Sequence, residues 1–385
     1  MKRMSLFSAV LFAFSCDSAG TGSPNNGTDG GGASDDAGSS TADGGTTGTS
    51  PTLAGCPLLP SNHIFNTPID ALPVHPSSAM FMSTIGTRNL HLDLGTTVDQ
   101  QSPTYYGIPY NIVRGGTVSW TKIAFYSADS SLNWDPRPEA DCAIGAARTL
   151  ASPCTAATAP SPLLPIPSGV LVEGGVNTAA SQMPYGDHHI LVLDADTCRL
   201  WETYHSYPDG TGGWNIFGSA TWDLRSSALR PTTWTSADAA GFPILPLLLR
   251  TAEASAGEIK HALRFTILSS KIRNSYVWPA RHKTGNNAST ALPQMGQLFR
   301  LKSSYAIPAA FNTQAKAILQ AMKTYGMYIA DGGSDWYVQG EPSADWQDQT
   351  ITQVQSVSSS NFEAVDMSAI TGRAGFDPNS GAVPQ

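Results

Sequence analysis

The side chains of this sequence that can carry out chemistry are carboxyl, imidazole and guanidinium groups close to predicted strands. Imidazole and carboxyl groups transfer protons, and a guanidinium or imidazolium group neutralises the carboxylate of an acidic sugar. A glycoside hydrolase uses instead two carboxyl groups that flank the scissile bond. The candidate catalytic residues are Asp187, His189, Glu258, His261, Arg264, Arg281, His282 and Asp331.

These residue types fit two kinds of polysaccharide-cleaving enzyme. The groups that a lyase would use are His189, Tyr204, His261, Arg264 and Arg281. The carboxyl groups that a glycoside hydrolase would use are Asp187, Glu258 and Asp331. Several tryptophans can stack on sugar rings, although we expect at least half of them to pack in the core: Trp201, Trp214, Trp222, Trp234, Trp278 and Trp336.

Two of the histidines are predicted to point into the protein. His189 shares a predicted strand face with Leu191, and His261 shares one with Ile259 and Leu263. An inward histidine is more often a hydrogen-bonded core residue than a catalyst, so this ordinary interpretation stands beside the catalytic one.

The same residues allow a different kind of site, a catalytic zinc centre. Its ligands would be His189, His261 and His282, with Asp187 beside them. His282 follows Arg281 in a loop-like stretch, which favours exposure. The sequence has no HExxH motif, so a divalent metal is one alternative among several.

The elements that position these side chains are mostly strands. The predicted strands are residues 188–194 and 200–207, joined as an antiparallel hairpin, residues 258–267, and residues 327–330 and 336–338, joined as a second hairpin. Helical spacing predicts one helix over residues 313–325 and a shorter one over residues 236–241. The chain is therefore predicted to be mainly β: a single large β-sandwich or jelly-roll-like domain with a few peripheral helices.

Four stretches together resemble a family of large exported bacterial proteins whose activity is uncharacterised. They are residues 185–194, 257–266, 278–282 and 325–331, and the resemblance extends over about residues 56 to 370. It implies secretion and one compact domain, and it implies no activity. It also implies that Asp187, His189, His261 and His282 occupy recurring positions of the family.

The N-terminus predicts export. Lys2 and Arg3 precede a short apolar run over residues 6–14, and Cys16 follows a serine, an order that resembles a bacterial lipoprotein signal in which Cys16 carries the lipid. Ordinary secretion is the alternative. Residues 17–52 are rich in Gly, Ser, Thr and Asp and predict a disordered tether, because they cannot bury enough apolar surface to fold. The globular domain is predicted over residues 53–385.

Charge and cysteine content agree with an exported domain. The signal carries two positive charges and the tether five negative ones, so of the net charge of −8 the remaining chain carries −5. A mildly acidic domain without basic clusters argues against nucleic acid as a partner. Beyond Cys16 the cysteines are even in number, and we expect the disulfides Cys142–Cys154 and Cys56–Cys198; a metal site is the less favoured alternative because the cysteines lack CxxC spacing.

We therefore expect a polysaccharide-active enzyme, a lyase or a glycoside hydrolase, that is secreted or anchored to the cell envelope by a flexible tether. Two alternatives stay open: a non-catalytic glycan-binding or structural surface lipoprotein, and a metal-dependent hydrolase. The expected partner is a polysaccharide or another extracellular polymer. The expected contact with a membrane is through the N-terminal lipid only.

Overall fold

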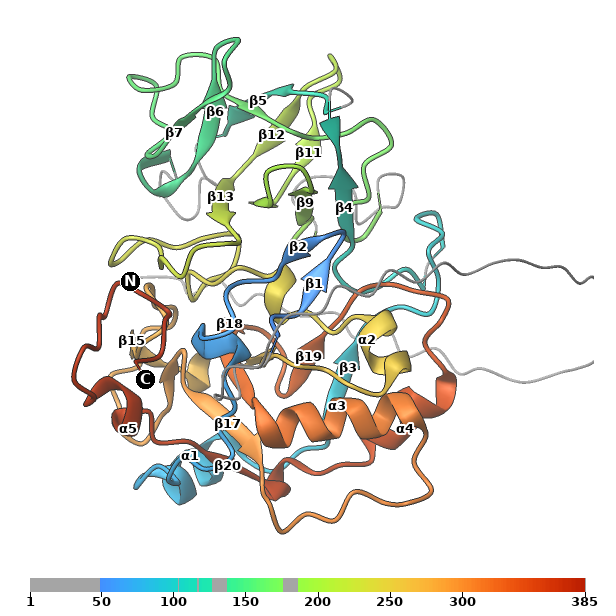
Figure 1. Cartoon of the computed structure of the whole chain (residues 1–385), viewed down its shortest axis with the longest axis vertical. Coiled ribbons are helices and arrows are strands. Elements are labelled where there is room, and N and C mark those ends of the chain that lie inside the picture. Colours follow the sequence, from blue (N-terminus) through green and yellow to red (C-terminus); the bar gives the residue numbers. More distant parts are fainter. Residues whose placement is uncertain (1–48, 103, 116–117, 127–136, 176–185, 385) are drawn as a thin grey trace, which may run out of the picture. The chain divides into compact units, whose positions relative to one another are not determined.

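Strands account for most of the regular structure in this chain (Figure 1). The computed structural model describes residues 49–102, 104–115, 118–126, 137–175 and 186–384. The predicted signal peptide with Cys16, and the tether as far as residue 48, lie outside the described residues. Residues 47–385 form one compact unit.

The bounds of the strands are β1 Thr52–Leu53, β2 Cys56–Pro57, β3 His91–Asp93, β4 Tyr110–Val113, β5 Thr121–Phe125, β6 Cys142–Ile144, β7 Thr149–Ala151, β8 Leu163–Leu164, β9 Ile190–Asp194, β10 Arg199–Tyr204, β11 Tyr207–Pro208, β12 Trp214–Ile216, β13 Gly218–Asp223, β14 Leu263–Ile267, β15 Arg273–Tyr276, β16 Gln294–Met295, β17 Leu298–Leu301, β18 Met327–Gly332, β19 Tyr337–Gln339 and β20 Phe362–Ala364. The α-helices are α1 Ser78–Ile85, α2 Thr251–Ala256, α3 Thr313–Thr324, α4 Asp348–Gln355 and α5 Ser368–Thr371.

The first predicted hairpin is confirmed. β9 and β10 pair antiparallel, and they form the centre of a four-stranded sheet with the order β13-β10-β9-β4. Both faces of β9 are covered, because Leu191 and Leu193 pack in one hydrophobic cluster while Ile190 and Val192 pack in another. Burial on both sides explains why β9 reads as a continuous aliphatic run rather than an alternating one.

The second predicted hairpin is wrong. β18 and β19 belong to a six-stranded sheet with the order β20-β17-β18-β14-β19-β3, in which β14 lies between them. β14 runs parallel to β18 and antiparallel to β19. All five residues of β14 are buried, including Arg264 and Thr266, as the interior position of this strand in the sheet requires. Figure 1 shows α3 and α4 alongside the strands of this sheet.

The strand predicted over residues 258–267 is only half correct. Helix α2 ends at Gly257, whose left-handed backbone (φ 82°) closes the helix, and the strand begins only at Leu263. Residues 258–262 are therefore a connection, and period-two arguments do not apply to His261. His261 is nevertheless fully buried.

A single jelly-roll sandwich is not confirmed. The third large sheet has the order β11-β12-β5-β8-β6-β7, and parallel pairs occur in all three large sheets, at β12–β5, β14–β18 and β4–β9. The fold is mainly β, with several mixed sheets and few helices.

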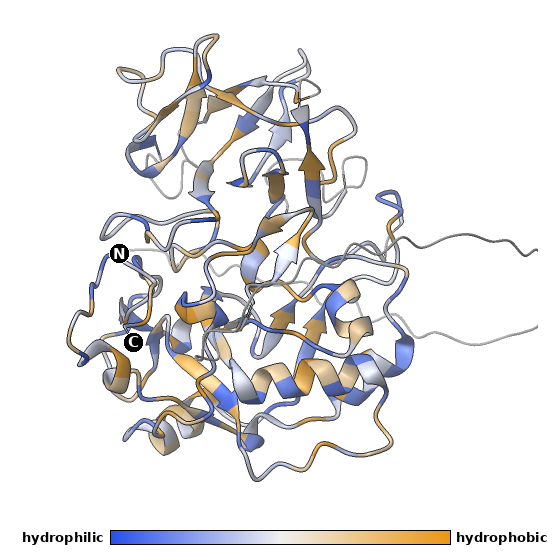
Figure 2. Ribbon diagram, in the orientation of Figure 1, coloured by the Kyte–Doolittle hydropathy of each residue, from blue (hydrophilic) through white to orange (hydrophobic). Residues whose placement is uncertain are grey.

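Of the two predicted helices, the longer one is confirmed. The side chain of Asn312 caps α3 by accepting a hydrogen bond from the backbone N–H of Ala315, and hydrophobic and hydrophilic residues alternate along the helix (Figure 2). Residues 236–241 form a turn instead of the predicted shorter helix. This turn is the centre of the candidate site described below.

Both predicted disulfides are confirmed. Cys56 pairs with Cys198 and Cys142 pairs with Cys154, as is typical of proteins from oxidising compartments. Among the described residues, no helix combines the length and the apolar character needed to cross a membrane.

The two disulfides should contribute unequally to stability. They close separations of 142 and 12 residues, and loop entropy then predicts losses of about 5 and about 3 kcal/mol when each is removed. Urea unfolding of the double variants Cys56→Ser/Cys198→Ser and Cys142→Ser/Cys154→Ser measures both. An equal or larger loss for the short loop would contradict the prediction.

Candidate functional site

The turn from Thr235 to Gly241 is held in place by a buried ion pair. Asp238 Oδ2 accepts hydrogen bonds from Arg264 Nη2 and Nε of β14 at 2.7 and 3.1 Å, and both side chains are almost completely buried. Asp238 Oδ1 accepts a third hydrogen bond from the backbone N–H of Ala240. The turn is thereby fixed to the centre of the six-stranded sheet.

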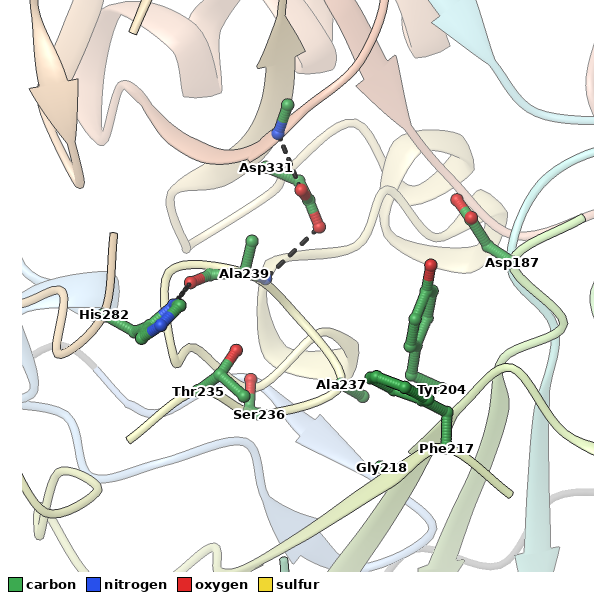
Figure 3. A pocket seen from close by; sticks show the side chains of 11 residues that line it. Asp187, Tyr204, Phe217, Gly218, Thr235, Ser236, Ala237, Ala239, His282 and Asp331 are labelled. Carbon is green, nitrogen blue, oxygen red and sulfur yellow. Dashed lines mark hydrogen bonds between the residues drawn. The ribbon is translucent and has the colours of Figure 1, made fainter. Parts of the chain in front are cut away.

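The turn forms part of the wall of a pocket of about 430 Å³ (Figure 3). The rest of the wall comes from the loop before β9, from the end of β10 and the start of β13, from the end of β18, and from the segment between β15 and β16. The residues that line the pocket are Asp187, Tyr204, Phe217, Gly218, Thr235, Ser236, Ala237, Ala239, His282, Asp331 and Gly332. Two carboxyl groups and two aromatic rings thus meet around one cavity.

Of the two carboxyl groups in the pocket wall, Asp331 is the one that is hydrogen-bonded to the turn. Its Oδ2 accepts a hydrogen bond from the N–H of Ala239 at 3.2 Å, and its Oδ1 accepts one from the N–H of Gly332 at 2.6 Å. Burial and the negative charges of Asp238 and Asp187 nevertheless raise its pKa to about 7. Near neutral pH, Asp331 is therefore able both to hold and to release a proton.

Asp187 and Tyr204 present free polar groups to the pocket. In the described part of the chain, no hydrogen bond joins the carboxylate of Asp187 or the hydroxyl of Tyr204 to another protein group. Figure 3 shows the Tyr204 hydroxyl directed toward the space between Asp187 and Asp331. The surrounding protein and the charge of Glu173 raise the pKa of Asp187, and burial beside Asp187 and Asp331 raises that of Tyr204, which keeps the phenol protonated.

A buried His189–Glu173 pair lies behind the pocket. His189 Nδ1 donates to Glu173 Oε2 at 2.5 Å, and Nε2 donates to the carbonyl of Ala237 in the turn at 3.0 Å. Burial alone would lower the pKa of His189, but the charge and hydrogen bond of Glu173 outweigh it and raise the pKa to about 9. His189 is therefore a cation that joins the loop before β9 to the turn.

His282 reaches the pocket and binds the same turn. Its Nδ1 donates to the carbonyl of Ala239 at 2.9 Å, two residues beyond the carbonyl that His189 contacts. Of the predicted catalytic residues, the structure thus gathers Asp187, His282 and Asp331 in the pocket wall, with His189 and Arg264 directly behind it.

The other predicted site residues lie elsewhere. Glu258 is exposed and pairs with Lys260 at 3.0 Å. His261 is buried beside Arg250 and Glu253. Arg281 is a structural group, whose guanidinium donates to the carbonyls of Arg230 and Pro378 at 2.7 Å each.

The proposed zinc ligands do not meet. His189, His261 and His282 each bind different protein groups, and in the described part of the chain no group of three metal-ligating side chains could hold an ion. None of the six tryptophans proposed for sugar stacking, all of them described by the structure, lines the pocket. Three of the six, Trp201, Trp222 and Trp336, are buried.

Sequence reasoning missed Asp238, Glu173 and Phe217. Asp238 was not recognised because a helix was predicted over residues 236–241. The sequence Ser236-Ala237-Asp238 is also typical of a turn in which Ser or Asp side chains accept hydrogen bonds from nearby backbone N–H groups. Glu173 stands between a buried valine and two glycines, and an acidic residue in such an apolar setting is a recognisable signal. No family model, no curated protein and no solved structure matches this chain.

Removal of Asp238 should weaken the fold and change the proton affinity of Asp331. Asp238→Ala leaves Arg264 buried and unpaired, which costs about 3–5 kcal/mol of unfolding free energy. It should also lower the pKa of Asp331 below about 7, because a negative neighbour is lost and Arg264 becomes an uncompensated positive one. Carboxyl NMR titration measures this pKa.

The control is Glu363→Ala. Glu363 forms a largely buried ion pair with Arg300 at 2.8 Å, and neither residue lines the pocket. This variant should cost similar stability and leave the pKa of Asp331 unchanged. The same pKa change in both variants would show that general loosening, and not the turn, controls Asp331.

Proposed function

We propose that this protein is a glycoside hydrolase that acts on an extracellular polysaccharide. The observation that carries the proposal is the presence of Asp187 and Asp331 in the wall of one pocket, both with a raised pKa. Asp331 donates its proton to the glycosidic oxygen. The free carboxylate of Asp187 acts on the sugar carbon, either directly or through a water molecule.

The environments of the two carboxyl groups support these separate roles. A general acid works best with a pKa close to the working pH, which burial and two negative neighbours give to Asp331. A nucleophile or base needs an accessible carboxylate, and Asp187 is exposed at the pocket. Tyr204 and Phe217 supply aromatic surface for a sugar ring.

The pocket favours a hydrolase over a lyase. A lyase needs a cation to neutralise the carboxylate of its uronate substrate. Arg264 is committed to Asp238 and Arg281 to backbone carbonyls. Among the described residues that line the pocket, His282 is then the one basic residue. Two carboxyl groups in the same wall would repel a uronate, so the proposed substrate is a neutral glycan.

We also propose that the domain works outside the cytoplasm, anchored by a lipid on Cys16. The two disulfides support an oxidising compartment, and the sequence up to Cys16 resembles a lipoprotein signal. Metabolic labelling with a radioactive fatty acid tests the anchor. The natural chain should take up label and Cys16→Ser should not; label on both, or on neither, would contradict this anchor.

The catalytic proposal predicts that each carboxyl group is needed. Asp187→Asn and Asp331→Asn should each lower kcat/KM at least 100-fold without loss of folding, because each removes one half of the acid–base pair. The assay is release of reducing ends from a panel of neutral polysaccharides by the purified chain. Glu258→Gln, an exposed carboxyl group outside the pocket, is the control and should keep full activity.

The pH profile should follow the same two groups. Asp331 acts as an acid only when protonated, so kcat/KM should fall as the pH rises through about 7. Asp187 acts only when ionised, so kcat/KM should fall again at acidic pH. The assignment would be contradicted if Asp331→Asn had full activity, or if its kcat/KM still fell as the pH rises through about 7. Glycan binding with no cleavage by the natural chain would favour a lectin instead.

A further inference from the structure

The strand that carries Asp331 leads directly into a second pocket. This pocket has a volume of about 440 Å³, and it is lined by residues 87–91, Asp335, Tyr337 and Gln355. Residues 331–337 therefore run from the wall of the first pocket, at Asp331 and Gly332, to the wall of the second, at Asp335 and Tyr337.

The sheet register places both pockets along one row of side chains. Asp331 of β18 pairs with Thr266 of β14, Thr266 pairs with Tyr337 of β19, and Tyr337 pairs with His91 of β3. Paired residues of neighbouring strands point to the same face of a sheet. The row crosses three strand spacings, so His91 lies roughly 14 Å from Asp331 along the sheet.

A second row behind the first fixes the strands in this register. Arg264 of β14 donates to Gln339 of β19, and Gln339 pairs with Asp93 of β3. Arg264 also holds the turn through Asp238. The ion pair that builds the first pocket thus belongs to the same polar face that leads to the second.

The segment between the residues of the two pocket walls carries small side chains. Gly333 and Ser334 are both exposed there, and the hydroxyl of Thr266 donates to the carbonyl of Ser334 beneath them. A Cβ atom on Gly333 would come within 2.9 Å of Thr266 Oγ1, so this position is restricted to a residue without a side chain. A chain of sugars that leaves the first pocket therefore meets backbone rather than a wall of side chains.

The second pocket offers an aromatic platform. The rings of His91 and Tyr337 stack with centroids 4.0 Å apart and an angle of 23° between their planes, and both side chains are partly exposed. Asn89, Gln355 and Arg88, whose side chain is 66% exposed, supply hydrogen-bond donors around the rings. Burial lowers the pKa of His91, which keeps the ring neutral.

We infer that the His91–Tyr337 pocket is a distal sugar-binding subsite of the same groove, which takes a neutral sugar unit of the polysaccharide whose scissile bond lies between Asp187 and Asp331. The inference rests on the proposed hydrolase function. An aromatic ring pair with amide donors at its edge is the surface that a neutral pyranose or furanose ring requires, with one apolar face and hydroxyls around it.

Chain-length dependence tests the inference. With neutral oligosaccharides of increasing length, kcat/KM of the natural chain should rise until the distal pocket is filled. Tyr337→Ala and His91→Ala should lose about tenfold in kcat/KM on the long substrates, the factor for an aromatic contact of about 1.4 kcal/mol. Both should match the natural chain on the shortest substrate that is cleaved. Tyr106→Ala, an exposed aromatic residue that lines neither pocket, is the control.

The possible failures are distinguishable. If the natural chain cleaves glycans but the two variants keep the full length dependence, the distal subsite is wrong and the hydrolase proposal stands. If the natural chain cleaves no glycan, the hydrolase proposal fails, and the subsite is judged by binding of the full chain to immobilised neutral oligosaccharides. Loss of binding in Tyr337→Ala but not in Tyr106→Ala would then support it, and equal binding or none would overturn it.

Discussion

The ion pair between Asp238 and Arg264 is the constraint on which the candidate site depends. The removal of two charges from water costs free energy, and a protein tolerates it only when both groups form all their hydrogen bonds. Here one carboxylate satisfies the guanidinium of β14 and a backbone N–H of the turn. The turn must therefore lie against the sheet in one position, and its backbone groups then organise the pocket: an N–H for Asp331 and carbonyls for His189 and His282.

The second feature of the site is an excess of acids. Burial raises the pKa of Asp93 to about 6 and that of Glu202 to about 7. The negative charges of Glu173 and Asp187 raise the pKa of Asp93 further, and that of Asp238 raises the pKa of Glu202 further. A folded-state pKa above the unfolded value means that the folded protein binds the proton more tightly, so these acids contribute stability at low pH that is lost as the pH rises through 6 to 7. Buried acids with raised pKa values lower the free energy of unfolding near neutral pH, and such groups are typical of functional sites.

Local sequence signals predicted the elements that depend on neighbouring residues. The β9–β10 hairpin, helix α3 and both disulfides follow from aliphatic runs, capping and cysteine parity, and all are observed. The assumption that strands close in sequence pair with each other failed for β18 and β19. β14, which ends at Ile267, lies between them in the sheet, although β18 begins only at Met327. Helix propensity failed at residues 236–241, where the Asp238 side chain captures the backbone N–H of Ala240. Asp187, His282 and Asp331 were identified from residue type, but their convergence depends on long-range pairing that periodicity does not encode.

We propose that Asp187 and Asp331 together add water across a glycosidic bond. The most direct measurement is mass spectrometry of the products formed in water enriched with oxygen-18. Hydrolysis places one solvent oxygen on the anomeric carbon of each new reducing end, while the other fragment keeps the glycosidic oxygen. The expected products are therefore saturated, and each fragment with a new reducing end carries one heavy oxygen atom. Unsaturated products without the heavy oxygen, or intact glycan after prolonged incubation with every neutral polysaccharide offered, would contradict it.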